Sequence, residues 1–453
     1  MRSIETGNVM VIGGGGREEA VTRQLEKSPG VKSIFAVPGH DLMKDNATKP
    51  VEIFPQYKTT DVKAITEICE AKKIELVFVE QDNAVAVGLG NALRSKGVLV
   101  VGPTKEAGQI EWDKGWARDF GARHNLNQPN YEVFYSLEEA RRFLEEQEDR
   151  RRYVKPAFLA GGEGPESAKD NKDALSKLKQ LLRDFPEASK KFLIEDWIIN
   201  EDGSPGEEFS AFAIVAGEDY VIKGYAQDNK RRQNFDQGPQ TGGMACVSPP
   251  LAVTLEIEAD VKSIFDRTAK GLYAEGRSYQ GILYLGGMIV IEKGAPVVKN
   301  VEFNARDGDP EEQAILPGIL NDWYEVGKRI AQGDIKGLVI ENDGKVRVVI
   351  AGVARGYPGR EPDATGKIIH GLGDVRRRPG VTLVGARVKK EGNRYYATGN
   401  RRIFYIVAEG SDVIEARERG YGAMSLVSIE GNNLDFRDDA GWRDVQRLRE
   451  KRA

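Results

Sequence analysis

The segment NVEFNARDGDPEEQ, residues 300–313, joins a strand pattern to side chains that suit a metal ion. Alternate residues of a strand share a face, so Glu302, Asn304 and Arg306 should project together before a Gly-Asp-Pro turn ends the strand. A carboxylate and an amide oxygen on one face suit Mg²⁺, which keeps waters and shares ligands with nucleotide phosphates. Arg306 could hold a carboxylate or phosphoryl group by its planar fork. A surface strand with alternating polar residues is the alternative.

Strand patterns flank this segment. Residues 207–217, 219–228, 281–294 and 296–305 are predicted strands of an antiparallel or mixed sheet, with a helix at 253–276 between them. A final unit after about residue 334 contains further strands and a helix at 411–424. Residues 227–250 are dense in charge and glycine, which predicts either a ligand-binding turn or a flexible exposed loop.

The N-terminal hundred residues alternate between strand and helix patterns. NVMVIGGGGREEAVTRQLEKSPG, residues 8–30, predicts a strand, a glycine turn and a helix. Further strand and helix patterns follow, with a helix at 83–96, which indicates a parallel α/β sheet. The glycine turn does not fit the dinucleotide pattern GxGxxG, because Glu18 stands at its sixth position. A helix N-terminus beside Arg17 nevertheless suits a phosphate group.

A small α+β unit follows a predicted helix at 107–123 and a polar linker. Its strand YVKPA ends in the loop FLAGGEG, where glycines free the backbone N–H groups to face an anion, although Glu163 adds a negative charge. Lys155 is a candidate phosphate ligand. The apolar strand at 191–198 carries Glu195 and Asp196, which could supply hinge contacts to an adenine and an acid to its ribose.

Composition excludes several classes of protein. The 453 residues exceed one core and indicate about three domains, or four with a small lid. A net charge of -4 gives no general attraction to nucleic acid or to an anionic membrane, and the two cysteines cannot build a disulfide framework. The absence of a signal core and of a long apolar run favours a cytoplasmic protein that does not span a membrane. We expect a monomer and leave a dimer open.

The order of the motifs resembles that of ATP-grasp ligases, and specifically of the phosphoribosylamine-glycine ligase family. The resemblance spans nearly the whole chain, from VIGGGGREEA and FAVPGH through LIEDWI, GPQTGGMACVSPP and VEFNARDGDPEEQ to the terminal DAGWR. It implies an N-terminal parallel α/β domain at 1–106, an ATP-grasp central domain at 107–125 and 197–333, an ATP-grasp lid at 126–196, and a small C-terminal α+β domain at 334–453.

The resemblance also implies a role for particular residues. ATP would lie between lid and central sheet, with Mg²⁺ or Mn²⁺ on Glu302 and Asn304, and the N-terminal domain would help to bind the substrate. The implied ATP-binding residues are Lys155, Gly161, Gly162, Gly164, Glu195, Asp196, Trp197 and Ile198. The implied substrate-binding residues are Gly15, Gly16, Arg17, Glu18, Gly39, Thr241, Gly242 and Gly243, with the glycine turn and Arg17 on the substrate phosphate. Arg306, Asp309 and Asp228 would line the glycine and acyl-phosphate pocket.

The reaction implied by this resemblance belongs to purine biosynthesis. ATP phosphorylates the carboxylate of glycine, and the amine of 5-phosphoribosylamine attacks the glycyl phosphate, giving the amide, ADP and phosphate. No protein nucleophile is needed. Catalysis would rest on positioning, charge neutralisation and closure of the lid.

Two single residues and one short segment depart from the family pattern. Glu163 stands where a second lysine is usual, and this change would cost about 1 to 4 kcal/mol per charge pair if the acid faced phosphate. EQDNAV at 80–85 replaces a usual Gly-Pro-Glu, and Asp307 replaces a usual phenylalanine. Two alternatives therefore stay open, namely an ATP-grasp ligase with another amino acid or amine, and a non-catalytic nucleotide-binding relative.

Overall fold

The N-terminal domain is the predicted parallel α/β sheet. The computed structural model describes residues 6–161, 164–359 and 361–452. The sheet order is β3-β2-β1-β4-β5, and every pairing in it is parallel. Its strands are β1 (Gly7–Gly13), β2 (Val31–Pro38), β3 (Val51–Ile53), β4 (Ile74–Val79) and β5 (Leu99–Val101). Because parallel strands end at a common edge, the glycine turn after β1 lies at the carboxyl edge of the sheet.

Helices cover this sheet, and two predicted helices are divided in the structure. The N-terminal helices are α1 (Gly16–Lys27), α2 (Asp41–Asn46), α3 (Val62–Lys72), α4 (Asp82–Ala86) and α5 (Leu89–Ser95). The helix predicted at 83–96 breaks at Gly88, whose φ of 81° is left-handed. The helix predicted at 107–123 becomes α6 (Gln109–Trp112) and α7 (Lys114–Arg123), because Asp113 caps a new helix by accepting from the N–H of Trp116.

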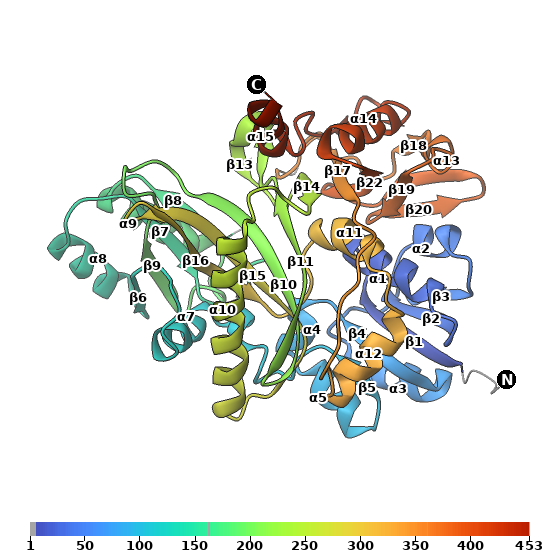
Figure 1. The fold of residues 1–453 in the computed structure, drawn as a ribbon, viewed down its shortest axis with the longest axis horizontal. Coiled ribbons are helices and arrows are strands. Elements are labelled where there is room, and N and C mark those ends of the chain that lie inside the picture. Colours follow the sequence, from blue (N-terminus) through green and yellow to red (C-terminus); the bar gives the residue numbers. More distant parts are fainter. Residues whose placement is uncertain (1–5, 162–163, 360, 453) are drawn as a thin grey trace.

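The lid-sized unit is a four-stranded sheet with two helices. The strand order is β6-β9-β7-β8, with β6 (Tyr131–Phe134), β9 (Phe192–Asp196), β7 (Arg152–Pro156) and β8 (Glu166–Ala168). The helices α8 (Leu137–Glu146) and α9 (Asn171–Asp184) begin at side-chain caps, Ser136 and Asp170. Figure 1 shows this unit at one side of the central sheet and the N-terminal domain at the other.

One large sheet runs through the centre of the molecule and into the C-terminal part. Its main path is β16-β15-β10-β11-β14-β17-β22-β19, and β24 pairs with β17. The strands are β10 (Glu207–Gly217), β11 (Asp219–Asp228), β14 (Ala245–Ser248), β15 (Tyr279–Glu292), β16 (Ala295–Asn304), β17 (Val346–Ala354), β19 (Val381–Gly385), β22 (Arg402–Gly410) and β24 (Leu434–Asp435). The four predicted central strands are confirmed. The sheet continues across position 333, where the sequence predicts a domain boundary, and this division stays a prediction.

The remaining elements pack around this sheet. The segment 227–250 is not a bare loop, because it forms the hairpin β12 (Arg231–Gln233) and β13 (Gln237–Gln240) before β14 joins the large sheet. A second C-terminal sheet has the order β20-β21-β18-β23, with β20 (Val388–Glu391), β21 (Arg394–Ala397), β18 (Ile368–His370) and β23 (Ser428–Ile429). The helices are α10 (Leu255–Ala274), α11 (Glu311–Ile315), α12 (Trp323–Gln332), α13 (Leu372–Val375), α14 (Val413–Met424) and α15 (Trp442–Arg452). No helix of the described residues is long and apolar enough to cross a membrane.

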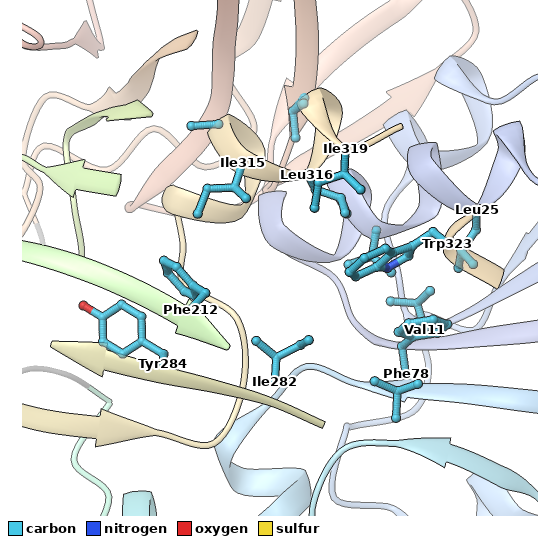
Figure 2. Packing of buried hydrophobic residues seen from close by; sticks show 14 of the residues in the cluster. Val11, Leu25, Phe78, Phe212, Ile282, Tyr284, Ile315, Leu316, Ile319 and Trp323 are labelled. Atoms are coloured by element: carbon cyan, nitrogen blue, oxygen red, sulfur yellow. The ribbon is translucent and has the colours of Figure 1, made fainter. Parts of the chain in front are cut away.

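A shared hydrophobic core joins the N-terminal domain to the central sheet. Figure 2 shows Val11 and Phe78 of the N-terminal sheet, Phe212 and Ile282 of the central strands, and Trp323 of α12 in one cluster. Burial of a large apolar side chain contributes about 1.5 to 3 kcal/mol. The two units are therefore held together by packing, which fixes the glycine turn relative to the end of β16.

Candidate active site

One large cleft of about 1080 Å³ is lined by residues of the N-terminal sheet, the lid-sized unit, the central sheet and the C-terminal part. Most of the residues implied by the family resemblance line it, although they are spread over nearly 300 positions of sequence. They are Gly15, Arg17, Glu18, Gly39, Lys155, Gly161, Glu195, Asp196, Trp197, Ile198, Asp228, Thr241, Gly242, Glu302, Asn304, Arg306 and Asp309. The structure thus brings the predicted ATP, metal and substrate residues into a common space.

Three described residues of the predicted set do not line this cleft. A Cβ on Gly16 would lie 2.2 Å from Tyr405, and one on Gly164 would lie 2.4 Å from Pro156, so both glycines permit close packing within the protein. Gly243 has a φ of +111° and approaches Pro310 in the same way. The predicted residues Gly162 and Glu163 lie outside the described residues.

The end of β16 brings the predicted metal ligands together. Glu302 and Asn304 lie two positions apart on the strand, and both line the cleft with Arg306, as the alternation predicts. Arg306 donates to the amide oxygen of Asn304 at 3.1 Å and pairs with Glu111 at 3.1 Å. Phe303, on the opposite face, is buried in the core with α10, as either interpretation of the strand expects. The position of Glu302 and Asn304 in the cleft favours the functional pattern over a surface strand.

Glu302 is a carboxylate among cations to which it is not directly bonded. Burial opposes its ionisation, but Lys114, Lys230 and Lys155 outweigh this effect and lower the pKa of Glu302. Within the described residues, no ion pair within 4.0 Å and no hydrogen bond reaches its carboxylate oxygens. Its lone pairs therefore remain available to a cation from the cleft, which fits a metal site.

A buried ion cluster supports the lid side of the cleft. Glu195 accepts from Arg118 at 2.7 and 3.1 Å, and it pairs with Lys155 at 2.8 Å. Burial opposes ionisation, but the two cations lower the pKa of Glu195 to about 2. Burial lowers the pKa of Lys155, and Glu195 and Glu302 oppose that shift. We call Arg118, Lys155 and Glu195 the lid triad. Its formal charge is positive, so Lys155 can present positive charge to the cleft.

The hinge strand ends in an acid that is already engaged. Asp196 pairs with Arg152 at 2.7 Å and with Arg150 at 2.9 Å, and it accepts from Asn130 at 2.8 Å. These bonds occupy most of the acceptor positions of the Asp196 carboxylate, so few remain for the predicted contact to a ribose. Trp197 follows directly and lines the cleft, 6.0 Å from the ring of Tyr153. These aromatic rings could form an apolar wall for a base.

The glycine turn after β1 already carries an anion of its own. The N–H of Gly15 donates to Glu18 at 2.6 Å, and Glu18 also accepts from Arg17 and Gln81 at 2.8 Å. A carboxylate at a helix N-terminus is stabilised by the exposed N–H groups and the helix dipole. The predicted phosphate donors Gly15 and Arg17 are therefore largely satisfied by Glu18.

Two of the departures from the family pattern meet behind this turn. The N–H of Asp307 donates to Glu80 at 3.2 Å, and the carbonyl oxygen of Asp307 accepts from Arg17 and from Arg306, both at 2.9 Å. Residue 307 is thus held through its backbone by one acid and two arginines of the cleft. The side chain of Asp307 faces a lysine instead, as described next.

Lys223 of β11 neutralises the buried acids in this region. Its ammonium contacts Asp307 at 2.5 Å and Glu312 at 2.6 Å, and it is 1% exposed. We call Lys223, Asp307 and Glu312 the hub triad. Burial and Asp307 raise the pKa of Glu312, and the same causes raise the pKa of Glu80 to about 8. One lysine among these acids favours retention of a proton by the cluster.

The other predicted catalytic acids, Asp228 and Asp309, also line the cleft. Burial raises the pKa of Asp228, at the end of β11, to about 7, while Lys230 opposes the shift. Asp309 accepts from Gln313 at 2.8 Å and lies 3.5 Å from Arg402, and despite burial Arg402 and Arg17 lower its pKa. The turn at 241–243 is tied to the C-terminal part, because the N–H of Gly242 donates to Tyr357 at 2.8 Å.

Several residues of the cleft were not identified from the sequence. Lys114 and Glu111 flank the metal-type strand, Lys230 follows Asp228, and Arg402 begins β22. Arg118 and Lys223 do not line this cleft, and they act by pairing with Glu195 and Asp307. The charge-dense segment 227–250 and the pair of arginines at 401–402 are sequence features that could have pointed to Lys230 and Arg402. Arg118 and Lys223 look like ordinary polar residues of a helix and a strand.

Comparison with protein-family models assigns two regions of the chain. Residues 7–111 match the N domain of phosphoribosylglycinamide synthetase, and residues 112–312 match its ATP-grasp (A) domain. Together these matches cover more than half of the chain.

Curated relatives extend this similarity to nearly the full length. Phosphoribosylamine–glycine ligase of Escherichia coli strain K12 is 31% identical over 442 residues, covering 97% of this chain and 99% of the relative. The ligase of Chlorobaculum tepidum is 32% identical over 426 residues, covering 93% and 97%. The trifunctional purine biosynthetic protein adenosine-3 of Drosophila melanogaster is 32% identical, and the match covers 95% of this chain and 31% of that protein.

Solved structures agree with this assignment. The crystal structure of phosphoribosylamine–glycine ligase from Thermotoga maritima has a TM-score of 0.77 and 26% identity, covering 95% of this chain and 99% of that one. A biotin carboxylase domain from Hydrogenobacter thermophilus, solved with MgADP, shares the fold at a TM-score of 0.71 and 15% identity. The chain belongs to the phosphoribosylamine–glycine ligase (phosphoribosylglycinamide synthetase) family of ATP-grasp proteins.

Proposed function

We propose that this protein ligates glycine to 5-phosphoribosylamine with ATP, through a glycyl phosphate. The observation that carries the proposal is the end of β16, where Glu302, Asn304 and Arg306 line the cleft that Lys155 also enters. A metal-type pair between two cations suits phosphoryl transfer to a carboxylate. The two substrates are those in the name of the curated relatives, phosphoribosylamine–glycine ligase.

The donor set fits Mg²⁺ or Mn²⁺. Mg²⁺ commonly binds one or two carboxylates and completes its coordination with waters and substrate phosphates. The described residues contain no group of three or more His, Cys, Asp or Glu side chains arranged to hold a metal. Glu302 and the amide oxygen of Asn304 would therefore hold the ion together with ATP oxygens. The bound ion would neutralise charge on the transferring phosphoryl group.

The chain's own residues would do the rest by positioning. Lys155, which is held by Glu195, would contact ATP phosphates. Trp197 and Ile198 would flank the adenine. Arg306 would bind the glycine carboxylate as it becomes phosphorylated, because a guanidinium matches both carboxylate and phosphate geometry. Asp228, whose raised pKa keeps part of it protonated near neutral pH, could exchange a proton with the attacking amine.

The test is ADP release measured with each substrate omitted in turn. We expect full ADP release when ATP, glycine, phosphoribosylamine and Mg²⁺ are all present, and little when glycine is left out. Glu302→Ala should abolish turnover with the fold intact by circular dichroism. Glu292→Ala removes an acid paired with Lys299 on the same hairpin and serves as the matched control. ADP release without glycine dependence would refute the proposal.

A ligase with another acceptor is the second candidate, because the two departures Glu80 and Asp307 lie beside Arg17. Replacing phosphoribosylamine by other primary amines in the same assay separates the two. A higher kcat/KM with a different amine would favour the second candidate.

A further inference from the structure

We infer that Arg387, at the start of the C-terminal strand hairpin, binds the phosphate group of the acceptor substrate, beside Arg402. This inference rests on the proposed function and moves the phosphate away from the glycine turn. Arg387 lines the active-site cleft together with Arg401, Arg402 and Tyr405. Nothing in the family comparison assigns these C-terminal arginines a role.

Arg387 is a positive charge whose surroundings offer no anion. Within the described part of the chain, neither an ion pair nor a side-chain hydrogen bond reaches its guanidinium, and the side chain from Cδ to Nη1 packs over Gly399. Arg387 is exposed where it lines the cleft, and partial desolvation together with the charges of Arg401 and Arg402 lowers its pKa. Because Arg387 lines the cleft without an anionic partner of its own among the described residues, its planar guanidinium is available to an anion that enters the cleft.

Arg387, Arg401 and Arg402 together form what we call the arginine surface. Arg402 lies at the edge of this surface that faces the acceptor end of the cleft. Its guanidinium lies 3.5 Å from the carboxylate of Asp309, and it donates to the carbonyl oxygen of Gly242. A Cβ on Gly15 would lie 3.5 Å from Asp309, so the glycine turn faces the same carboxylate. The arginine surface is therefore next to the N-terminal domain, whereas Lys155 and Lys114 stand at the ATP end around Glu302.

The glycine turn is the poorer phosphate site of the two. Glu18 already accepts from Gly15 and Arg17, and Glu80 lies behind the turn, so a dianion there would meet carboxylates. A phosphate monoester matches the planar fork of an arginine and could be shared by Arg387 and Arg402. The acceptor, 5-phosphoribosylamine, is the substrate of the proposed reaction that carries such a group apart from ATP.

Ribose 5-phosphate and ribose are suitable probes because they differ only in the phosphate. We expect isothermal titration of the full chain to show at least tenfold tighter binding of ribose 5-phosphate. Arg387→Gln should weaken this binding about 10- to 100-fold, the range for one charge-assisted hydrogen bond, and Arg387→Lys should recover part of it. Arg394→Gln, on the exposed neighbouring strand β21 and outside the cleft, is the control and should bind as the wild type does.

Kinetics distinguish the acceptor phosphate from ATP. In Arg387→Gln the KM for phosphoribosylamine should rise at least tenfold, with less than a twofold change in the KM for ATP. The inference is overturned if the wild-type chain does not prefer ribose 5-phosphate, if Arg387→Gln binds it normally, or if the KM for ATP rises instead.

Failure of the proposed function has a separate signature. Hydroxylamine is a small amine without phosphate that can trap glycyl phosphate as a hydroxamate, and the wild-type chain should release ADP with ATP, glycine and hydroxylamine. Absence of that reaction would refute the acyl-phosphate chemistry, whereas the ribose 5-phosphate titration would still decide the role of Arg387.

Discussion

The lid triad and the hub triad are built from the same kinds of ion in opposite proportion. In the lid triad, Arg118 and Lys155 surround one acid, Glu195. In the hub triad, two acids surround one lysine, Lys223. The first cluster has a positive excess that reaches the cleft through Lys155. The second is sealed from it and holds residue 307, from which Arg17 and Arg306 take their positions.

The comparison shows that a buried ion cluster can serve either as a source of charge or as a support. Because ATP carries several negative charges, a cation in excess is useful only where it faces the cleft. The charge of a lysine surrounded by acids is neutralised within the cluster and cannot attract a ligand. Its bonds instead fix the backbone at the end of β16.

Lys223→Met should reduce the free energy of unfolding by about 3 to 5 kcal/mol, because it leaves Asp307 and Glu312 buried without a cation. The midpoint of urea unfolding measures this loss. Lys96→Met, which removes an exposed pair with Glu70, should leave the midpoint unchanged. Adding Asp307→Leu and Glu312→Gln to Lys223→Met should restore much of the loss, since the remaining charges are removed together. A single variant as stable as the wild type would contradict the hub assignment.

Lys155→Met should raise the KM for ATP about 10- to 100-fold, as expected for loss of a charged contact to phosphate. Its effect on the urea midpoint should be smaller than that of Lys223→Met, because Arg118 still neutralises Glu195. Lys179→Met, on an exposed turn of α9 in the same lid, is the matched control. If stability collapsed while the KM for ATP did not change, the lid triad would be a support and the comparison would fail.

Glu80→Gln should flatten the pH dependence of stability between pH 5 and 8. The pKa of Glu80 rises from an ordinary value of 4.5 to about 8 in the folded protein, so the folded state binds a proton more tightly. The resulting stability is fully present below pH 4.5 and is lost as the pH rises to 8, by up to about 1.4 kcal/mol per pH unit. Urea midpoints at several pH values measure the slope. An unchanged slope in the variant would mean that Glu80 stays ionised.

Glu195→Gln should act in the opposite pH range. The pKa of Glu195 falls from 4.5 to about 2, so its contribution to stability is present above pH 4.5 and is lost as the pH falls toward 2. The variant should therefore show a weaker dependence on pH in acid and the wild-type dependence above pH 5. Loss of the slope above pH 5 instead would assign Glu195 the behaviour expected of Glu80.

Much of the cleft was predictable because local patterns carry it. The alternation that places Glu302 and Asn304 on one face depends only on strand geometry, and the apolar run before the glycine turn predicts β1 and α1. Whole-chain resemblance then predicted that distant motifs meet. The breaks at Gly88 and Asp113 were missed, because one depends on a left-handed residue and the other on a cap within an otherwise helical pattern.

The donors at the glycine turn show where such patterns fail. From the sequence, Gly15 and Arg17 at a helix N-terminus indicate a phosphate site, but the rotamer of Glu18 uses those donors. No local pattern specifies which of two nearby anions, a protein carboxylate or a ligand, takes an N–H group.

Periodicity and residues a few positions apart were enough to predict the central strands and the shared face of Glu302 and Asn304, and the motifs of the whole chain were enough to predict the family. Which charges neutralise one another depends on the folded chain. Arg118 meets Glu195 across 77 positions, Lys223 meets Asp307 across 84, and Arg402 reaches Asp309 from the C-terminal part. Coulomb energies depend on distance in space and on burial, and neither can be read from separation along the chain.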